Sequence, residues 1–554
     1  MGVKGGVAPS VVIVGAGPTG LALAIELGSR SIPCLVIERN VRAGWAPRAK
    51  TTHTRTREHL RRWGIADRLA AASPFGVDYP TNITFVTRLS GKLIARFDYG
   101  LQGSPEKDER YAEHSQWIPQ YKLEAVLLDH ARSLPSVTIA FGHEFLSFAQ
   151  DANGVQVRVR DVETDEEEEV AALYLVGADG ARSKVRDEIG ARMEGTYGLS
   201  RNYNTIFRAP GLAEKHPSGP AIMYWQINGE VPSLIGPMDE GDLWYFMPTG
   251  LPQGMTYADD EIAEVIRIST GVDCDYEVLS SDEWVASRLI ADRYSDGRAF
   301  LVGDACHLHP PFGGYGMNMG VADSVDLGWK LAAVLQGWGG AELLDTYETE
   351  RRPAHQFVLD EAEKNHSMLP NHLFKHGIEE DTPEGESIRA EAAALIQASK
   401  RNEFYSPGVM LGYRYEGSPI IAYDEAGEAF SWTRDYVPSA APGCRAPHHW
   451  LADGRSLYDL FGAGFTLLVL GDADGADIAA AVAEAQAANV PLKIVTFVDP
   501  ALAARYEATR ALIRPDQHVA WRGDWWPAGT GLLDLVTGQG DASAQADENR
   551  TMHA

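Results

Sequence analysis

Cysteine is scarce in this chain of 554 residues, and its four cysteines are far apart. Cys34, Cys274, Cys306 and Cys444 form no CxxC pair and match neither a disulfide framework nor the ligand spacing of a zinc site. We therefore expect a reducing compartment, no metal site and no thiol-exchange chemistry. No charged region followed by an apolar stretch and a cleavage site occurs near residue 1, so we expect no signal peptide and a cytoplasmic location.

Basic residues are few relative to acidic ones, and no long apolar run is uninterrupted. The chain has 49 lysines and arginines against 77 aspartates and glutamates, which gives a net charge of -28. This balance argues against nucleic acid and anionic membranes as partners. The most apolar segment, residues 11–27, is broken by Gly15, Gly17, Pro18 and Gly20, so we expect no membrane span.

Glycine, in contrast, is placed in a pattern that predicts phosphate binding. The segment Gly15-Ala16-Gly17-Pro18-Thr19-Gly20 follows the apolar run 11–14 and precedes a helical pattern over 21–27. A second apolar run, 34–37, ends at Glu38, about 20 positions beyond the glycines, where an acidic residue holds a ribose hydroxyl. The glycines allow phosphate to approach the positive end of the helix. Residues 11–38 therefore predict a dinucleotide site.

Two further glycine turns follow segments that we expect to be strands. Alternating strands over 137–175 end at Gly177-Ala178-Asp179-Gly180, and the apolar run 299–302 ends at Gly303-Asp304-Ala305. The segment Pro310-Pro311-Phe312-Gly313-Gly314-Tyr315-Gly316-Met317-Asn318 then opens a helix that we expect to run to about residue 335. Between 195 and 290, short aromatic and apolar runs separated by glycine, proline and aspartate predict an antiparallel sheet.

The order and spacing of these segments resemble the class A flavoprotein monooxygenases, the aromatic hydroxylases with the p-hydroxybenzoate hydroxylase fold. The third glycine turn and the P-x-x-x-x-G-x-N segment after it are the most specific part of a likeness that covers nearly the whole chain. Within the family, the chain resembles the phenol and chlorophenol hydroxylases and the aromatic polyketide hydroxylases, which carry an extra C-terminal domain. The signature of that domain is found in residues 443–448, 457–462 and 513–522.

The resemblance implies one bound FAD, with the first turn at its pyrophosphate, the second at its adenosine side and the third at its ribityl and isoalloxazine end. The cofactor-binding residues that it implies are Gly15, Gly17, Pro18, Thr19, Gly20, Glu38, Arg39, Arg48, Gln120, Asp179, Gly180, Gly303, Asp304, Pro311, Gly314, Gly316, Met317 and Asn318. A helix start at Met317 and Asn318 would stabilise negative charge on the reduced flavin. A helix cap in which Asn318 satisfies local donors is the structural alternative.

The predicted fold class is α/β. The resemblance implies a Rossmann-like FAD-binding domain in two parts, residues 8–190 and residues 291–395, of which the second includes a helical linker. An antiparallel-sheet substrate domain, residues 191–290, is inserted between them. Residues 396–554 are expected to form a thioredoxin-like α/β domain without CxxC.

The implied activity is a monooxygenation in which a flavin C4a-hydroperoxide, formed with O2, hydroxylates a phenolic or hydroxylated heteroaromatic ring. NADPH or NADH is the transient reductant, and the sequence does not distinguish them because no second G-x-G-x-x-G follows a strand. We expect a small aromatic substrate and a homo-oligomer. The alternatives are an epoxidation or Baeyer-Villiger outcome, and a non-catalytic flavin-fold binding protein. Intact Asp304, Gly316 and Asn318 argue against the latter.

A phenol becomes a good nucleophile only after its hydroxyl proton leaves, and its pKa is about 10 by analogy with tyrosine. A group near the ring should therefore accept that proton. His309 and Tyr315 are the catalytic candidates, because both lie close in sequence to the third glycine turn. Tyr224, Trp225 and Tyr245 are candidates for substrate contact, although aromatic residues in such strands more often belong to the core.

Overall fold

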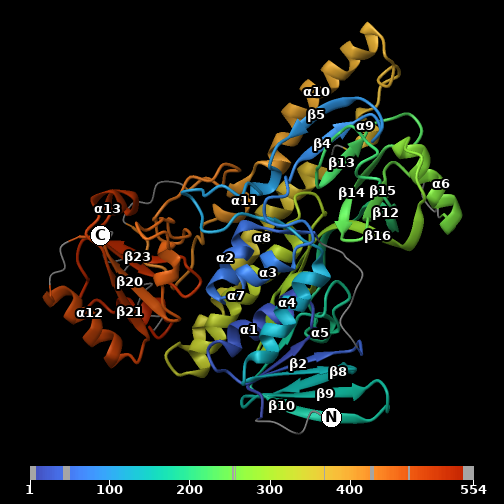
Figure 1. The fold of residues 1–554 in the computed structure, drawn as a ribbon. Helices are drawn as coiled ribbons and strands as arrows, with labels where there is room; N and C mark the ends of the chain where they lie inside the picture. The colour runs from blue at the N-terminus through green and yellow to red at the C-terminus, as the bar shows by residue number, and fades with distance from the viewer. Residues whose placement is uncertain are drawn as a thin grey trace.

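A computed structural model describes residues 8–41, 50–251, 255, 257–366, 369–424, 430–471 and 475–540 (Figure 1). A layer of helices occupies the centre of the molecule. In Figure 1 the red C-terminal domain lies on one side of this layer, and the eight-stranded sheet, with green strands β12 to β16 and blue strands β4 and β5, lies on the other. The fold is of the predicted α/β class, with several sheets joined through the central helices.

The nucleotide fold is built on a six-stranded sheet with the order β17-β18-β11-β1-β2-β7, parallel except for β17. Its strands are β1 (Val11–Val14), β2 (Cys34–Glu38), β7 (Val137–Phe141), β11 (Tyr174–Gly177), β17 (Ser295–Asp296) and β18 (Ala299–Leu301). The apolar run of β1 is buried along its whole length because both faces of the sheet are covered. The predicted strands at 11–14, 34–37 and 299–302 are confirmed as members of one sheet.

Helices cover one face of this sheet, and an antiparallel meander covers the other. The helices are α1 (Pro18–Gly28), α4 (Gln120–Ser133) and α7 (Tyr315–Leu335), and the meander consists of β8 (His143–Gln150), β9 (Val155–Asp161) and β10 (Glu167–Ala172). Leu27 and Leu331 pack on the strands from the helical side, and Val157 and Val159 pack from the meander side. The apolar residues of α1, α4 and α7 also pack against one another.

The eight-stranded sheet lies beside the nucleotide fold and is antiparallel except where β13 pairs with β4. In order across the sheet, its strands are β19 (His307–Leu308), β16 (Glu277–Ala291), β12 (Met193–Arg208), β15 (Leu243–Pro248), β14 (Ser233–Asp239), β13 (Met223–Gln226), β4 (Ile83–Val86) and β5 (Leu93–Phe97). Helix α6 (Asp259–Thr270) covers one face, and α10 (Pro383–Phe404) packs against β5. Strand β19 directly follows the Gly303 turn, so this turn connects the two sheets.

Two strands of this sheet come from the part of the chain that we predicted to belong to the nucleotide fold. Strands β4 and β5 lie within residues 8–190, yet β4 pairs with β13 of the inserted segment. A local sequence pattern identifies a strand but not its partner, because the partner is set by tertiary packing. Strands β4 and β5 therefore belong to the eight-stranded sheet, which we predicted to be the substrate domain.

Short elements connect the two sheets and extend the helical layer. They are β3 (Thr51–Thr52), α2 (Thr54–Arg62), α3 (Ala66–Ala72), β6 (Gln116–Trp117), α5 (Lys184–Glu188), α8 (Thr346–His366), α9 (Pro370–Leu373) and α11 (Pro407–Leu411). Strand β3 pairs with β6 and leads into α2, which packs on α7. Within the described ranges, no helix has both the length and the apolar character needed to cross a membrane.

The C-terminal domain is a four-stranded sheet with the order β21-β20-β22-β23. Its elements are β20 (Phe465–Val469), α12 (Gly475–Ala487), β21 (Leu492–Thr496), α13 (Pro500–Tyr506), β22 (Arg510–Ile513), β23 (Val519–Gly523) and α14 (Leu532–Val536). Strands β20 and β21 are parallel, and the other pairs are antiparallel. The predicted strand-helix-strand unit is confirmed, and the topology is compatible with a thioredoxin-like domain.

Buried ion pairs join this domain to the nucleotide fold. Arg514, just after β22, lies 2.6 Å from Glu350 of α8 and 3.1 Å from Asp326 of α7. These three side chains are at most 1% exposed. A second buried pair joins Arg445 to Glu58 of α2. The C-terminal domain is therefore attached through charges enclosed in the interface.

Candidate active site

The first and second glycine turns are in direct backbone contact. A Cβ atom at Gly15 would overlap the carbonyl oxygen of Ala178, and Gly15 has a φ of +108°, a conformation that L side chains rarely adopt. A Cβ at Gly20 would overlap the carbonyl oxygen of Gly15 and lie 3.3 Å from the side chain of Ala178. Only glycine allows this approach at the end of β1.

The third glycine turn reaches the same place through Thr19. A Cβ at Gly303 would lie 2.8 Å from Thr19 Oγ1, and a Cβ at Gly320 of α7 would lie 2.5 Å from the same atom. The start of α1 is thus enclosed between the Gly303 turn and α7. Three segments that are far apart in sequence meet around one point, as the FAD resemblance requires.

Three other glycines of these segments face open space. A Cβ at Gly17, Gly180 or Gly316 would have no atom within 4 Å. Gly17 is the residue before α1, and Gly316 is in the first turn of α7, so two of these open positions lie at helix starts. Helix starts present free N–H groups and a positive dipole end, which favour phosphate and a developing negative charge. These residues fit an elongated, anionic dinucleotide such as FAD.

Acidic residues stand at the ends of the neighbouring strands. The Glu38 carboxylate, at the end of β2, accepts a hydrogen bond from the N–H of Ala16 at 3.0 Å and so lies beside the first turn. The Asp179 carboxylate accepts hydrogen bonds from the N–H groups of Lys184 (2.7 Å) and Val185 (3.2 Å), and burial raises its pKa. Asp179 therefore fixes the second turn to α5.

The remaining predicted cofactor residues are distributed around the same region. Asp304 and Pro311 are exposed on the turns that flank β19, and Arg39 is exposed after β2. Gln120 begins α4 and donates a hydrogen bond to Glu124. Arg48 lies outside the described residues, so its predicted contact with the flavin phosphates stays a prediction.

The side chain of Asn318 is fully engaged with protein partners. Its Oδ1 accepts hydrogen bonds from the N–H of His53 (2.8 Å) and the hydroxyl of Thr56 (2.7 Å). Its Nδ2 donates to the carbonyl oxygens of Thr51 (3.0 Å) and Gly314 (2.8 Å). This is the cap-like alternative considered above, extended to β3 and α2. Asn318 shapes the start of α7 rather than offering its side chain to a ligand.

The two catalytic candidates are both enclosed by protein. Tyr315 is 2% exposed, its ring stacks on His53 with centroids 5.7 Å apart, and burial raises its pKa. A tyrosine in this setting is a poor proton acceptor. His309 lies 3.2 Å from His307 between ring nitrogens, and burial holds its pKa well below the usual value. His309 is therefore a neutral imidazole, with an Nε2 atom that has no hydrogen-bond partner among the described residues.

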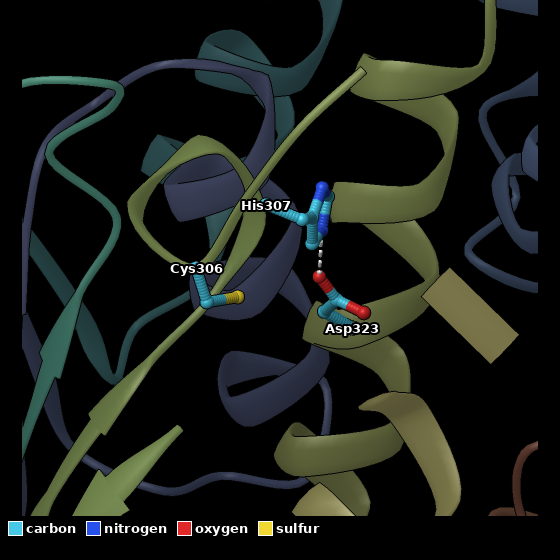
Figure 2. Close-up of side chains that lie close together, drawn as sticks. All are labelled: Cys306, His307 and Asp323. Carbon is cyan, nitrogen blue, oxygen red and sulfur yellow. Dashed lines mark hydrogen bonds and ion pairs between the residues drawn. The ribbon is translucent and has the colours of Figure 1, made fainter. Parts of the chain in front are cut away.

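A buried aspartate of α7 braces the third glycine turn from behind. Figure 2 shows Asp323 hydrogen-bonded to His307, with Cys306 beside them. Asp323 Oδ2 also accepts the N–H of Gly303 at 3.1 Å, while Oδ1 lies 2.8 Å from both Arg351 and His355.

The atoms of Cys306, His307 and Asp323 that could bind a metal lie within 4.8 Å of one another. Each oxygen of Asp323 already has two protein partners, and burial raises the pKa of the Cys306 thiol well above its usual value. A thiol that keeps its proton and a carboxylate that is already shared make a weak ligand set. The arrangement is better described as an ion network that positions the Gly303 turn.

Asp323 was not among the predicted site residues, although the sequence contains a signal for it. Asp323, Asp326 and Lys330 interrupt an otherwise apolar helix at spacings of three and four, which places them on one face. Charges on the buried face of a helix need partners, so such a pattern predicts an ion network. The partners themselves, on α8 and beyond, cannot be identified from sequence.

We expect Asp323→Asn to lower both thermal stability and FAD retention. The amide keeps the shape but removes the charge opposite Arg351, which costs about 1–3 kcal/mol in a buried network. Thermal unfolding and flavin content after gel filtration measure the two effects. The matched change Asp129→Asn, in an exposed pair with Arg68, should alter neither. An Asp323→Asn protein with wild-type thermal stability and flavin content would show that Asp323 does not brace the Gly303 turn.

The substrate candidates divide between the two faces of the eight-stranded sheet. Trp225 and Tyr245 belong to the cluster that contains Phe312, and the rings of Trp225 and Phe312 are 6.4 Å apart. Phe312 lies in residues 310–318, the turn that we expect beside the flavin and call the flavin turn. Tyr224 belongs to the opposite cluster, under α6, because successive side chains of a strand alternate. Its hydroxyl donates to the carbonyl oxygen of Gly219. Tyr224 therefore packs in the core under α6, away from Phe312, and its contact with substrate stays a prediction.

Comparison with known proteins agrees with this geometry. The family model described as "FAD binding domain" matches residues 9–362, and the model "Aromatic-ring hydroxylase, C-terminal" matches residues 439–538. The chain is 30% identical over 571 residues to 2,4-dichlorophenol 6-monooxygenase of Delftia acidovorans, covering 94% of this chain and 96% of that protein.

Solved structures give the same result. The rebeccamycin biosynthetic enzyme RebC with reduced flavin has a TM-score of 0.88 and 35% identity, covering 96% of this chain and 99% of that one. Aklavinone-11 hydroxylase in complex with FAD and aklavinone has a TM-score of 0.81 and 30% identity, covering 97% and 100%. The similarity extends over the nucleotide fold, the substrate sheet and the C-terminal domain.

Proposed function

This chain belongs to the FAD-dependent aromatic-ring hydroxylases, and from that premise we propose that its substrate is a phenol or a hydroxylated heteroaromatic ring, with NADPH or NADH as reductant. The observation that supports the proposal most strongly is the convergence of three glycine turns, through contacts of Gly15 with Ala178 and of Gly303 with Thr19, around the start of α1. The 2,4-dichlorophenol 6-monooxygenase relative is named for a phenol. Bound FAD supplies the chemistry, since it accepts electrons from the nicotinamide and activates dioxygen.

We assign the cofactor contacts by the position of each segment. The start of α1 at Gly17 would bind the pyrophosphate and Glu38 a ribose, because these groups border the first turn. The second turn, braced by Asp179, would hold the adenosine side. Asp304 would hold the ribityl chain, and the N–H groups at the start of α7 would stabilise negative charge on the ring system.

The substrate would lie against the face of the eight-stranded sheet that carries Trp225 and Tyr245. These rings and Phe312 exclude water, which favours productive oxygen transfer over loss of peroxide. His309 is the proposed proton acceptor, because its ring is neutral and one nitrogen has no partner in the described part of the chain. Tyr315 is proposed to position His53 and the turn instead.

We further propose that the enzyme works in the cytoplasm as a homo-oligomer. A reducing compartment is compatible with four buried cysteines that form no disulfide. The large excess of negative charge favours a small-molecule substrate over an anionic polymer.

The proposal is tested by product mass under labelled dioxygen. The FAD-loaded protein is incubated with NADPH or NADH, a panel of phenols and ¹⁸O₂. We expect one labelled oxygen in a product whose ring is intact. A ring-expanded lactone would indicate a Baeyer-Villiger oxidation, and an epoxide would indicate an epoxidation, in place of ring hydroxylation. Peroxide as the sole product with every phenol would contradict hydroxylation of this substrate class.

We expect Asp304→Ala to weaken FAD binding about 10-fold or more, because a lost hydrogen bond to a charged group is worth at least ~1.4 kcal/mol. Asp304 is exposed on its turn, so the fold should be unchanged. Isothermal titration of the apoprotein with FAD measures the effect. Asp345→Ala, at another exposed aspartate, serves as the control. Normal FAD affinity in Asp304→Ala would remove this residue from the site.

A further inference from the structure

Lys50 lies where the flavin turn meets the substrate sheet. Its carbonyl oxygen accepts a hydrogen bond from the N–H of Ile118 at 2.8 Å, which fixes its backbone beside β6. The next residue, Thr51, is packed against the flavin turn, since a Cβ at Gly314 would lie 3.3 Å from Thr51 Cβ. The Lys50 side chain extends to the sheet, where Nζ lies 4.2 Å from the centre of the Tyr245 ring.

The ammonium group of Lys50 has no anionic partner within the described ranges. Tyr245 is the aromatic ring over which it lies, and the Tyr245 hydroxyl donates to the carbonyl oxygen of Ile222 at 3.1 Å. Other lysines that contact this sheet are paired: Lys122 lies 2.8 Å from Asp239, and Lys400 lies 2.7 Å from Glu403. Lys50 therefore differs from these two lysines, because it has no carboxylate partner among the described residues.

Lys50 is partly buried, and a cation there without a counter-ion is unfavourable, because burial removes part of its hydration without returning an ion pair. Burial lowers the pKa of Lys50 to about 8, so this side chain is still charged in most molecules at neutral pH. Burial is the cause of this shift, to which no charged neighbour in the described part of the chain contributes. A perturbed, unpaired cation beside a ligand site is typical of a functional group awaiting an anionic ligand.

We propose that Lys50 binds the phenolate oxygen of the ring substrate and so selects rings that carry an acidic hydroxyl. This inference rests on the proposed function, because it places a phenol on the Tyr245 face of the sheet. An opposite charge within about 4–6 Å lowers the pKa of an acidic group by about 1–3 units. The phenol proton passes to His309, the proposed acceptor, and from there to solvent as the ligand binds. The ionised ring that remains is more electron-rich and a better nucleophile.

The inference is tested by the ionisation of 4-nitrophenol, whose phenolate is coloured, bound to the FAD-loaded protein. Absorbance is titrated against pH for the wild-type protein, Lys50→Met, Lys50→Arg and Lys122→Met. We expect the wild-type protein to lower the pKa of the bound phenol by about one unit or more, and Lys50→Met to abolish the shift. Lys50→Arg should restore part of it, and Lys122→Met should keep it. 4-Nitroanisole, which cannot ionise, should bind the wild-type and Lys50→Met proteins equally.

Flavin content measured on the same samples separates the possible failures. Loss of the pKa shift in a Lys50→Met protein that keeps its FAD supports the inference. An unchanged pKa shift in the Lys50→Met protein overturns the inference. A loss of binding in Lys50→Met that is confined to 4-nitrobenzoate also overturns it, because Lys50 would then bind a ring carboxylate. A wild-type protein that binds neither FAD nor 4-nitrophenol would overturn the proposed function itself.

Discussion

Replacing Gly17 by valine is expected to abolish FAD retention while the protein stays folded. Gly17 precedes α1 with φ of −72° and ψ of 180°, which valine can adopt, and its Cβ would have no atom within 4 Å. The change costs about 1 kcal/mol at a helix N-cap, too little to unfold a large protein. The valine side chain would instead fill the space through which a phosphate approaches the helix start. We expect FAD affinity to fall at least 100-fold, or about 2.7 kcal/mol.

The chain provides a matched control at another helix start. Gly475 begins α12 in the C-terminal domain, and a Cβ there would also have no atom within 4 Å. Gly475→Val should bind FAD like the wild-type protein. Titration with FAD and circular dichroism of both variants measure binding and folding separately. A Gly17→Val protein that keeps its flavin would place the pyrophosphate elsewhere.

Replacing Arg514 by methionine is expected to destabilise the protein by about 3–5 kcal/mol, the usual cost of breaking a buried ion pair. Arg514 contacts Glu350 at 2.6 Å, Asp326 at 3.1 Å and Asp516 at 2.7 Å, all inside the domain interface. Methionine has similar bulk but leaves Glu350 and Asp326 with Lys330 as their buried ion-pair partner and removes the arginine from Asp516. The C-terminal domain should therefore detach more readily from the nucleotide fold.

The loss of stability in the Arg514→Met protein should become smaller as the pH falls below 4.5. Burial would raise the pKa of Glu350, but Arg514 and Lys330 lower it from 4.5 to about 2. A carboxylate with a lowered folded-state pKa stabilises the protein above pH 4.5 and loses this contribution as the pH falls toward 2. The part of the stability difference between wild-type and Arg514→Met proteins that comes from Glu350 should therefore be full above pH 4.5 and shrink below it.

Calorimetric unfolding and limited proteolysis measure this effect at several pH values. Arg455→Met is the control, because Arg455 forms an exposed pair with Asp453 in the C-terminal part of the chain. The control should unfold at the wild-type temperature and resist protease equally. An Arg514→Met protein that unfolds like the control would show that the buried charges do not hold the domain in place.

Local patterns predicted the parts of the fold that depend on neighbours in sequence. The first strand, its glycine turn, the helix and the strand ending at Glu38 follow one another in the predicted order. The two strands pair with each other in one sheet. The convergence of the three turns was implied by the family resemblance. Its physical cause, the contacts of Gly15 with Ala178 and of Gly303 with Thr19, is visible only in three dimensions.

Features that depend on distant pairing could not be predicted. Strands β4 and β5 join the substrate sheet because β13 pairs with Ile83–Val86, which no local pattern shows. Tyr224 and Trp225 are equally aromatic, and only the register of β13 decides which of them faces the flavin turn. Lys50 is one basic residue among several in its segment, and only the folded structure shows that it has no counter-ion among the described residues.

The flavin content of the purified protein tests the central claim most directly. Absorbance and protein concentration, measured after incubation with excess FAD and removal of unbound cofactor, give the number of flavins held by each chain. We predict one FAD per chain in the wild-type and Gly475→Val proteins and almost none in Gly17→Val. A folded wild-type protein that stays colourless after this treatment would contradict a shared FAD site at the three glycine turns.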